Sequence, residues 1–231
     1  MALDTTKHRN ILIKILKDIY TDNTLGPLLG FKGGTAAYFF YGLSRFSVDL
    51  DFDLLDPKRE DYVFEKISKI VSNYGQIKEE YKKHYTLLFV LSYGEKEHNV
   101  KIEVRRLSLD SSYEVKNYLG IPMKIMSRAD MFANKLVAMS ERPNKANRDI
   151  YDVWFFLNND WPINRELVQE RTGITFKDFI KKCIKQLEGK SDKSILSGMG
   201  ELLDEKQKAF VKTKLKAETI FLLRNYLETI K

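Results

Sequence analysis

One stretch of the chain, FKGGTAAYFFYGLSRFSVDLDFDLL from Phe31 to Leu55, admits few three-dimensional arrangements. Two glycines open an apolar run typical of a buried helix, and a loop then leads into an alternating strand. Successive side chains of a strand point to opposite faces, so Asp49, Asp51 and Asp53 share one face. Like charges on one face repel one another unless a cation lies between them. The stretch therefore predicts a helix and a strand that meet at a cation site, for which a divalent metal is the simplest occupant.

The start of the predicted helix has the composition of a phosphate site. Gly33 and Gly34 would present bare backbone amides at a helix N-terminus, and Thr35 would cap the helix or donate to a phosphate. Asp49 and Asp51 can both reach one Mg²⁺ and bridge to a second, as nucleotidyl and phosphoryl transfer require. The run lacks the Gly-x-x-x-x-Gly-Lys-Ser/Thr pattern, which argues against a P-loop NTPase.

A third carboxylate is expected from a neighbouring strand. The segment Asn99–Leu107 alternates cleanly and is predicted to form a hairpin with Thr86–Tyr93. Glu103 lies on its polar face and is the candidate third metal ligand. The alternative is an exposed residue in a ladder of charges, and strand logic alone does not separate the two. Asp53 is expected at the strand end, close to the Asp-Pro turn, and not as a ligand.

The pattern along the chain divides it near residue 125. Residues 1–125 mix helices with strands, including a short strand at Ile121–Lys124 that ends at or just after Pro122. Residues 126–231 are all helical by period, and a single long helix is predicted for Glu205–Ile230. We expect two domains that pack tightly, because no Gly/Ser-rich linker separates them.

Composition excludes several classes. The longest apolar runs, such as Leu87–Leu91, are too short to cross a bilayer, and the N-terminus resembles an amphipathic helix more than a signal peptide. Cys183 is the only cysteine, so no intramolecular disulfide forms and a reducing cytoplasm is expected. The net charge is +7, and residues from Ile163 onward hold 15 Lys and Arg against 10 Asp and Glu. A basic helical region suits a nucleic-acid backbone, although solvated helix faces are the simpler explanation of the charge.

Two motifs resemble those of the AbiEii/AbiGii toxin family, within the DNA polymerase β-like nucleotidyltransferase superfamily. The run KGGTAAYFFYGLSRFSVDLDF is similar to the family's Gly-Gly-Thr-Ala-Leu and Arg-x-Ser-x-Asp-hydrophobic-Asp-Phe patterns, with Ala37 in place of the leucine. The run ADMFANKLVAMSERPNKANRDIYDVWFFL is similar to its Lys-Leu-x-Ala and Arg-Asp-hydrophobic-Tyr-Asp-hydrophobic patterns. The motifs stand in the family's order, and the last 70 residues match only in being helical.

The resemblance implies an α+β fold, in which a polymerase β-like mixed sheet is followed by an all-helical domain that contributes to the active site. It implies transfer of a nucleotide from an NTP with Mg²⁺ or Mn²⁺ on Asp49 and Asp51. Lys135 and Asp149 would join these two aspartates as catalytic residues. The nucleotide-binding residues would be Lys32, Gly33, Gly34, Thr35, Arg45, Ser47, Arg148 and Asp152.

Each of the two helical candidates has a structural alternative. Lys135 lies among apolar residues, and spacing alone favours a surface lysine whose stem packs against them. The alternative for Asp149 is an acid favoured by the dipole at the start of a helix. With the motif resemblance, the catalytic roles are favoured for both.

The leading hypothesis is a metal-dependent nucleotidyltransferase that adds NMP to a hydroxyl group of RNA, such as tRNA, or of a protein. The resemblance implies the toxin of a bacterial toxin-antitoxin or phage-exclusion system, with an antitoxin encoded nearby and no membrane partner. One alternative is an enzyme of the same fold that acts on a small-molecule hydroxyl. Another is a catalytically silent module that binds nucleotide or RNA.

Overall fold

The computed structural model describes residues 3–95, 97–107, 111–142 and 147–230. Contacts divide the chain into two compact units, which we call unit 1 (Met1–Ser127) and unit 2 (Arg128–Lys231). The domain boundary predicted after residue 125 falls two residues before this division.

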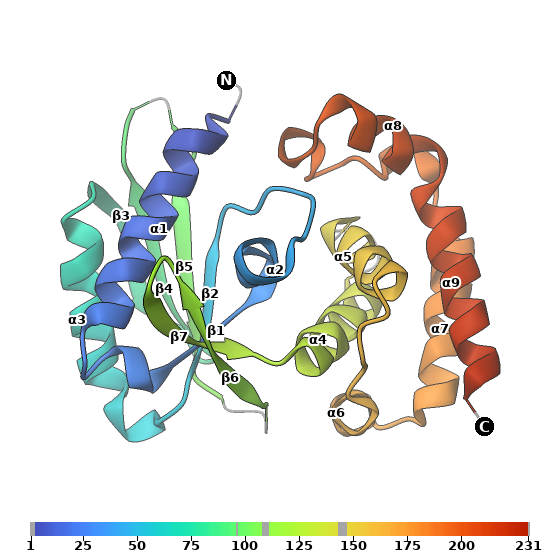
Figure 1. Ribbon diagram of the computed structural model, residues 1–231, viewed down its shortest axis with the longest axis horizontal. Helices are drawn as coiled ribbons and strands as arrows, with labels where there is room; N and C mark the ends of the chain where they lie inside the picture. The colour runs from blue at the N-terminus through green and yellow to red at the C-terminus, as the bar shows by residue number, and fades with distance from the viewer. Residues whose placement is uncertain (1–2, 96, 108–110, 143–146, 231) are drawn as a thin grey trace. The chain divides into compact units, whose positions relative to one another are not determined.

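Unit 1 is built on a seven-stranded mixed sheet with the strand order β3-β4-β5-β2-β1-β7-β6 (Figure 1). The β2–β5 and β1–β7 pairs are parallel, and the other neighbours are antiparallel. This confirms the predicted fold class. The strands are β1 (Leu29–Lys32), β2 (Leu50–Leu54), β3 (Gln76–Lys82), β4 (Thr86–Ser92), β5 (Val100–Arg105), β6 (Tyr113–Tyr118) and β7 (Ile121–Met126).

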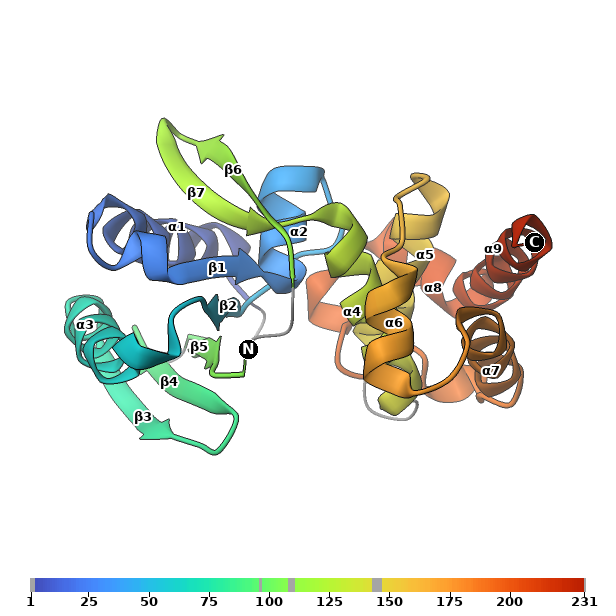
Figure 2. The same cartoon turned by 90° about the horizontal axis from the view of Figure 1, so that it is seen from below.

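Helices α1 (Thr5–Thr21) and α3 (Glu60–Ser72) lie on the same side of this sheet (Figure 2). Ring contacts join each helix to a strand, at 6.4 Å between the centroids of Tyr20 and Phe52 and 4.9 Å between those of Phe64 and Phe89. The apolar core of unit 1 therefore forms between these helices and the sheet. The third helix, α2 (Gly33–Tyr41), begins directly after β1.

The register of the central strands separates an apolar face from a polar one. Leu50 pairs with Ile102 on the apolar face, whereas Asp51 pairs with Glu103 and Asp53 with Arg105 on the polar face. The predicted hairpin is confirmed, because β4 and β5 pair from Thr86 opposite Arg105 to Leu91 opposite Val100. The polar side chains of β2 and β5 thus stand beside one another.

Three strands were not predicted from the sequence, and one was predicted to end too early. The missed strands are β1, only four residues long, β3, almost wholly exposed, and β6, which forms one edge of the sheet. Strand β7 continues past Pro122 to Met126. Its pairing with β1 is made at Ile125, three residues beyond the proline, so the missing amide of Pro122 does not interrupt it.

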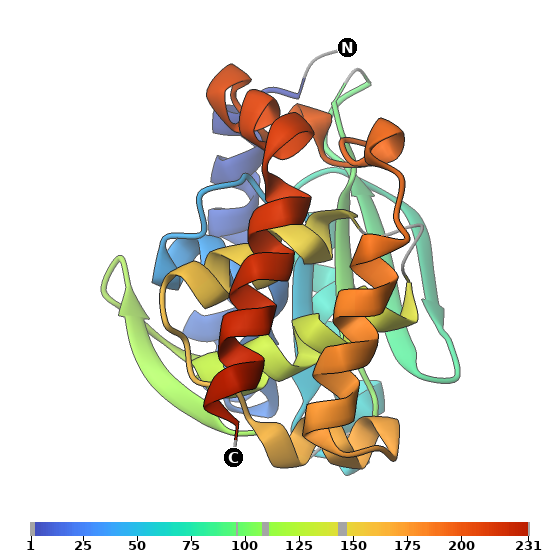
Figure 3. The same cartoon turned by 90° about the vertical axis from the view of Figure 1, so that its right-hand side faces the viewer.

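Unit 2 is helical throughout its described part. Its α-helices are α4 (Arg128–Glu141), α5 (Asn147–Asn158), α6 (Arg165–Thr172), α7 (Phe176–Glu188), α8 (Glu205–Thr213) and α9 (Leu215–Thr229). Helices α7 and α9 lie side by side (Figure 3). The predicted single helix over Glu205–Ile230 is wrong, because Lys214, with φ −128°, separates α8 from α9. No glycine or proline marks this break in the sequence.

In the described ranges of the chain, no helix combines the length and the apolar character that crossing a bilayer requires.

Candidate functional site

The start of α2 lies against the carboxylate of Asp51. Gly33 has φ +78°, a left-handed conformation that favours glycine. A Cβ atom added at Gly33 would overlap Oδ2 of Asp51, because Lys32 and Asp51 are opposite one another on β1 and β2. Glycine at this position therefore serves two purposes. It supplies the backbone conformation that opens the helix, and it leaves room for the carboxylate.

Gly34 makes the matching contact with the loop that precedes β2. A Cβ atom there would lie 2.8 Å from Nη2 of Arg45 and 2.9 Å from Oγ of Ser47. Both of these side chains are buried, so the guanidinium and the hydroxyl pack closely on the backbone of the Gly-Gly turn. The resemblance assigned these residues to nucleotide binding, and the structure gathers them around the first turn of α2.

Side chains hold the backbone of residues 45–49, which we call the motif loop. The Arg45 Nη1 atom donates to the carbonyl of Phe46 at 2.9 Å. The hydroxyl of Thr35 donates to the carbonyl of Asp49 and lies 2.9 Å from Oγ of Ser47. The carbonyl of Val48 accepts from Nε2 of His8 at 2.9 Å. Thr35 is fully buried and its hydroxyl is used internally, which supports a structural role over direct phosphate binding.

Three acids share the electrostatic neighbourhood of one lysine. Glu103 stands beside Asp51 in register, and its Oε1 lies 3.2 Å from Nζ of Lys101. Burial lowers the pKa of Lys101, but the charges of Glu103, Asp49 and Asp51 outweigh it and hold that pKa above its usual value. The polar face is therefore acidic enough to attract a cation.

The donor set fits Mg²⁺ only when substrate supplies further ligands. No group of three or more histidine, cysteine, aspartate or glutamate side chains within the described ranges lies close enough together to hold a metal ion. Glu103 is thus not gathered with Asp49 and Asp51 into a ready three-acid group. Mg²⁺ is usually held in proteins by one or two carboxylates together with phosphates and water. Asp49 and Asp51 meet that requirement in the presence of an NTP.

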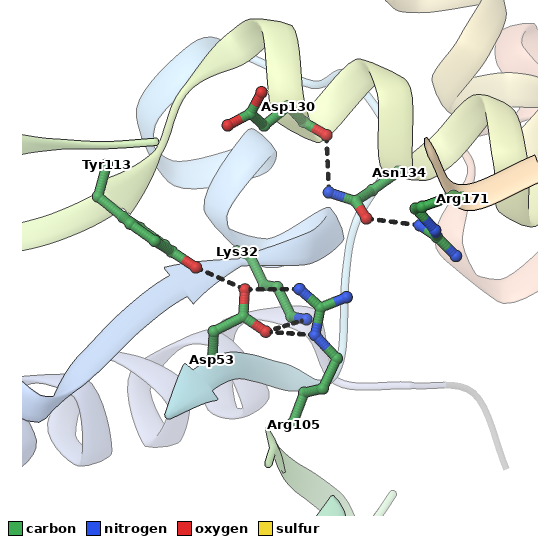
Figure 4. Close-up of polar contacts among 7 residues, drawn as sticks. All are labelled: Lys32, Asp53, Arg105, Tyr113, Asp130, Asn134 and Arg171. Carbon is green, nitrogen blue, oxygen red and sulfur yellow. Dashed lines mark hydrogen bonds and ion pairs between the residues drawn. The ribbon is translucent and has the colours of Figure 1, made fainter. Parts of the chain in front are cut away.

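Asp53 is the centre of a buried ion network that the sequence did not reveal (Figure 4). It is the next-to-last residue of β2, at the strand end where it was expected, and its carboxylate accepts from Nζ of Lys32 at 2.6 Å and from Nε of Arg105 at 2.7 Å. The hydroxyl of Tyr113 donates to the same carboxylate at 2.6 Å. The ring of Tyr113 fits there because Gly30 has no side chain, and a Cβ at that position would overlap it.

The charges of this network set the ionisation of its members. Burial acts to raise the pKa of Asp53, but Lys32 and Arg105 outweigh it and hold that pKa below its ordinary value. Burial lowers the pKa of Lys32, which Asp53 only partly offsets. Lys32 was predicted to bind nucleotide. Its ammonium faces Asp53 in the structure and would have to leave this partner to reach a phosphate.

In unit 2, the predicted residues of the second motif form an ion cluster between α4 and α5. Nζ of Lys135 lies 2.9 Å from Oδ1 of Asp149 and 2.9 Å from Oδ2 of Asp152. Both acids are buried, and Arg142 adds a contact to Asp149 at 3.1 Å. Lys135 is therefore not the snorkelling surface lysine that spacing alone suggested. Arg148, next to Asp149 on α5, is half-buried.

A second group of polar residues in unit 2 was not predicted from the sequence (Figure 4). Asp130 is buried on α4, and Nδ2 of Asn164 donates to its carboxylate at 2.6 Å. Asn134 donates to the Asp130 carbonyl at 2.8 Å and accepts from Nη1 of Arg171 at 2.6 Å. These bonds tie α4 to α6. Asn134 lies next to Lys135 in the sequence. An asparagine one helical turn after an aspartate is not a recognisable motif, so the sequence did not reveal this group.

A family model and solved structures of similar fold match this chain. Residues 14–216 match the family model described as nucleotidyl transferase AbiEii toxin, type IV toxin-antitoxin system. A candidate nucleotidyltransferase from Helicobacter pylori is similar in fold, with a TM-score of 0.60, 20% identity and coverage of 100% of this chain and 99% of that one. JHP933 from Helicobacter pylori is similar with a TM-score of 0.58 and 21% identity, covering 98% and 96% of the two chains. No curated protein sequence matches this chain significantly.

Proposed function

Because the chain belongs to the AbiEii nucleotidyl transferase toxin family, we propose that it transfers NMP to a hydroxyl group of RNA, such as tRNA, or of a protein. Family membership makes the chain a nucleotidyltransferase with an NTP as substrate and implies an antitoxin partner. Beyond family membership, we propose the class of acceptor, the metal and the roles of individual residues.

The observation that carries the proposal is the contact between Asp51 and the first residue of α2. A helix N-terminus offers free amides and a partial positive charge to a triphosphate. A carboxylate placed directly beside it can hold the metal that the same triphosphate binds. Phosphate and metal sites that share one turn of backbone are what nucleotidyl transfer requires.

Each part of unit 1 has a role in this scheme. Asp49 and Asp51 would hold Mg²⁺ or Mn²⁺, with Glu103 beside Asp51 as a third acid. When bound, the metal would neutralise charge on the phosphates and on the leaving pyrophosphate. Gly33 and Gly34 would present their amides to the triphosphate, with Arg45 and Ser47 bracing the turn from the motif loop.

Unit 2 would contribute Lys135, Asp149, Arg148 and Asp152. The two buried acids form ion pairs with the ammonium of Lys135 and limit its rotation. A lysine held in this way is suited to stabilise the triphosphate as the acceptor oxygen bonds to the α-phosphorus and pyrophosphate leaves.

The test is label transfer from each α-labelled NTP to total tRNA or to protein. Wild-type protein with Mg²⁺ should label one acceptor class, and Asp51→Asn should lower the rate by about 100-fold or more. Asp160→Asn is the matched control, because Asp160 is exposed and lies at φ 50°, where asparagine is equally tolerated. It should retain the wild-type rate.

Each remaining outcome has one reading. No transfer from any NTP to RNA, protein or small molecules contradicts the proposal, and NTP binding without turnover would indicate a silent binding module. Label on a small-molecule hydroxyl alone would indicate the small-molecule enzyme. Full transfer activity in excess EDTA would contradict the proposed dependence on a metal ion.

The family description, a toxin of a type IV toxin-antitoxin system, supports a toxic role in the cell. As a toxin, the chain would act in the cytoplasm, where NTPs and tRNA are found, and would serve phage exclusion. Its expression should arrest growth, and co-expression of the antitoxin encoded nearby should relieve the arrest. Growth arrest that persists in Asp51→Asn would contradict a role for nucleotide transfer in toxicity.

A further inference from the structure

One buried polar side chain of α1 contacts the motif loop. His8 is fully buried on the stripe of α1 that also carries Leu12, Ile15 and Ile19. Its ring lies edge-on to Phe46 at 6.0 Å and to Tyr93 at 5.6 Å between centroids. A histidine in an apolar stripe needs partners for both ring nitrogens, and both are present.

The partners specify one tautomer. Nε2 lies 2.9 Å from the carbonyl oxygen of Val48, and a carbonyl can only accept, so Nε2 carries the proton. Nδ1 lies 2.8 Å from the hydroxyl of Tyr93, and as the unprotonated nitrogen it accepts from that hydroxyl. Tyr93 thus fixes the ring so that its single N–H is aimed at Val48.

The bond to Val48 acts directly on the peptide that carries Asp49. The peptide unit is planar, so fixing the Val48 carbonyl also fixes the amide and the Cα of Asp49. The bond from Thr35 fixes the carbonyl on the other side of Asp49. His8 and Thr35 therefore hold the Asp49 backbone from both sides, and both come from helices distant in sequence.

We propose that His8 is a positioning residue for Asp49. This inference rests on the proposed function, because it assigns to His8 the placement of a carboxylate that the reaction uses. His8 also precedes the part of the chain that matches the family model. Its role is read from the contacts alone.

Three variants separate the hydrogen bond from the packing. His8→Phe fills the site but cannot donate to Val48. His8→Gln keeps an amide N–H at the reach of Nε2 and should restore the bond. His8→Leu, a better helix former, replaces the phenylalanine variant if that one does not fold. The matched control is His84→Gln, because His84 is exposed.

Two readouts are measured on each variant, both well below its unfolding temperature. In the transfer assay, His8→Phe should lower kcat by about 10-fold or more and leave KM for NTP within about 2-fold, because a displaced catalytic group affects turnover more than binding. In hydrogen exchange, the amides of residues 46–50 should exchange faster in His8→Phe. His8→Gln and His84→Gln should resemble wild type in both.

The second readout does not depend on the reaction. A wild-type protein that transfers no nucleotide contradicts the proposed function, and hydrogen exchange then decides the placement of the motif loop. Unchanged exchange in His8→Phe overturns the inference, as does His8→Gln behaving like His8→Phe. If kcat and KM of His8→Phe change only in parallel with its global stability, and the amides of residues 46–50 do not exchange faster, His8 has a purely structural role. That result also overturns the inference.

Discussion

Gly33 satisfies two structural requirements. Its backbone is left-handed, and the Asp51 carboxylate occupies the space where a side chain would lie. We expect Gly33→Ala to lose about 1–2 kcal/mol of unfolding free energy from the backbone alone. Its nucleotide transfer should fall by about 100-fold, because the added methyl group displaces Asp51. Urea unfolding and the label-transfer assay measure the two effects.

Gly42 provides the control for this prediction. It ends α2 at φ +71°, and a Cβ there would meet nothing within 4 Å. Gly42→Ala should therefore show a similar loss of stability with transfer near the wild-type rate. Equal loss of transfer in both variants would show that strain, and not the contact with Asp51, controls the activity.

The ionisation of His8 predicts a pH dependence of stability. Burial lowers its pKa below the ordinary 6.5, Asp49 and Glu97 act against burial, and His98 acts with it. Below pH 6.5 the unfolded chain binds the proton more readily than the folded one, so stability falls as the pH falls toward the folded pKa. Urea midpoints of wild type should drop more than those of His8→Gln between about pH 7.5 and about pH 5.5. Parallel curves would contradict this assignment.

At single positions, the sequence predicted those residues whose roles depend on neighbours close along the chain. The Gly-Gly pair and the Asp49–Asp51 pair could be read from alternation and helix-start chemistry. His8 could not, because its partners Val48 and Tyr93 lie 40 and 85 positions away along the chain. The ion network of Asp53 could not be predicted for the same reason, since Lys32, Arg105 and Tyr113 come from three other strands.

Between elements, α4 and α5 are joined by a charge cluster whose removal should be costly. Lys135→Met leaves Asp149 and Asp152 buried without their main counterion, so we expect a loss of about 3–5 kcal/mol. Arg142→Met should cost less than about 1 kcal/mol, because the Arg142 side chain is 58% exposed. Chemical denaturation of both variants checks the difference. Similar values would contradict it.

This prediction limits how activity data on Lys135 are read. A variant that destabilises α4 and α5 loses activity whether or not the lysine contacts substrate. Lys135→Arg keeps a cation for the two acids, so a loss of transfer in that variant with unchanged stability would support the proposed catalytic role.

The elements that sequence patterns missed gave no periodic signal of their own. Strand β1 is only four residues long. Strand β3 reads QIKEEYK and alternates poorly because it is exposed on both faces, and β6 is likewise an edge strand. The break between α8 and α9 has no local marker, since buried residues of both helices continue one apolar stripe. Strands with one buried face, β2 and β5, and the strongly amphipathic α1 were predicted from their periods.

At the scale of the molecule, each unit contains its own sheet or helix core. All seven strands lie in unit 1, so the fragment of residues 1–127 should fold without unit 2. We expect it to unfold cooperatively and to give dispersed amide resonances, yet to transfer no nucleotide, because it lacks Lys135 and Asp149. A fragment that is unfolded contradicts the first expectation, and one that retains transfer contradicts the proposed roles of unit 2.

The strand order also has a consequence for synthesis on the ribosome. Strand β1 pairs with β7, which ends at Met126, so the sheet cannot close until nearly all of unit 1 has emerged. Lys135 and Asp149 follow later still. On the proposed roles, a nascent chain gathers its acids before it acquires the lysine, and it would stay inactive at least until α5 has left the ribosome.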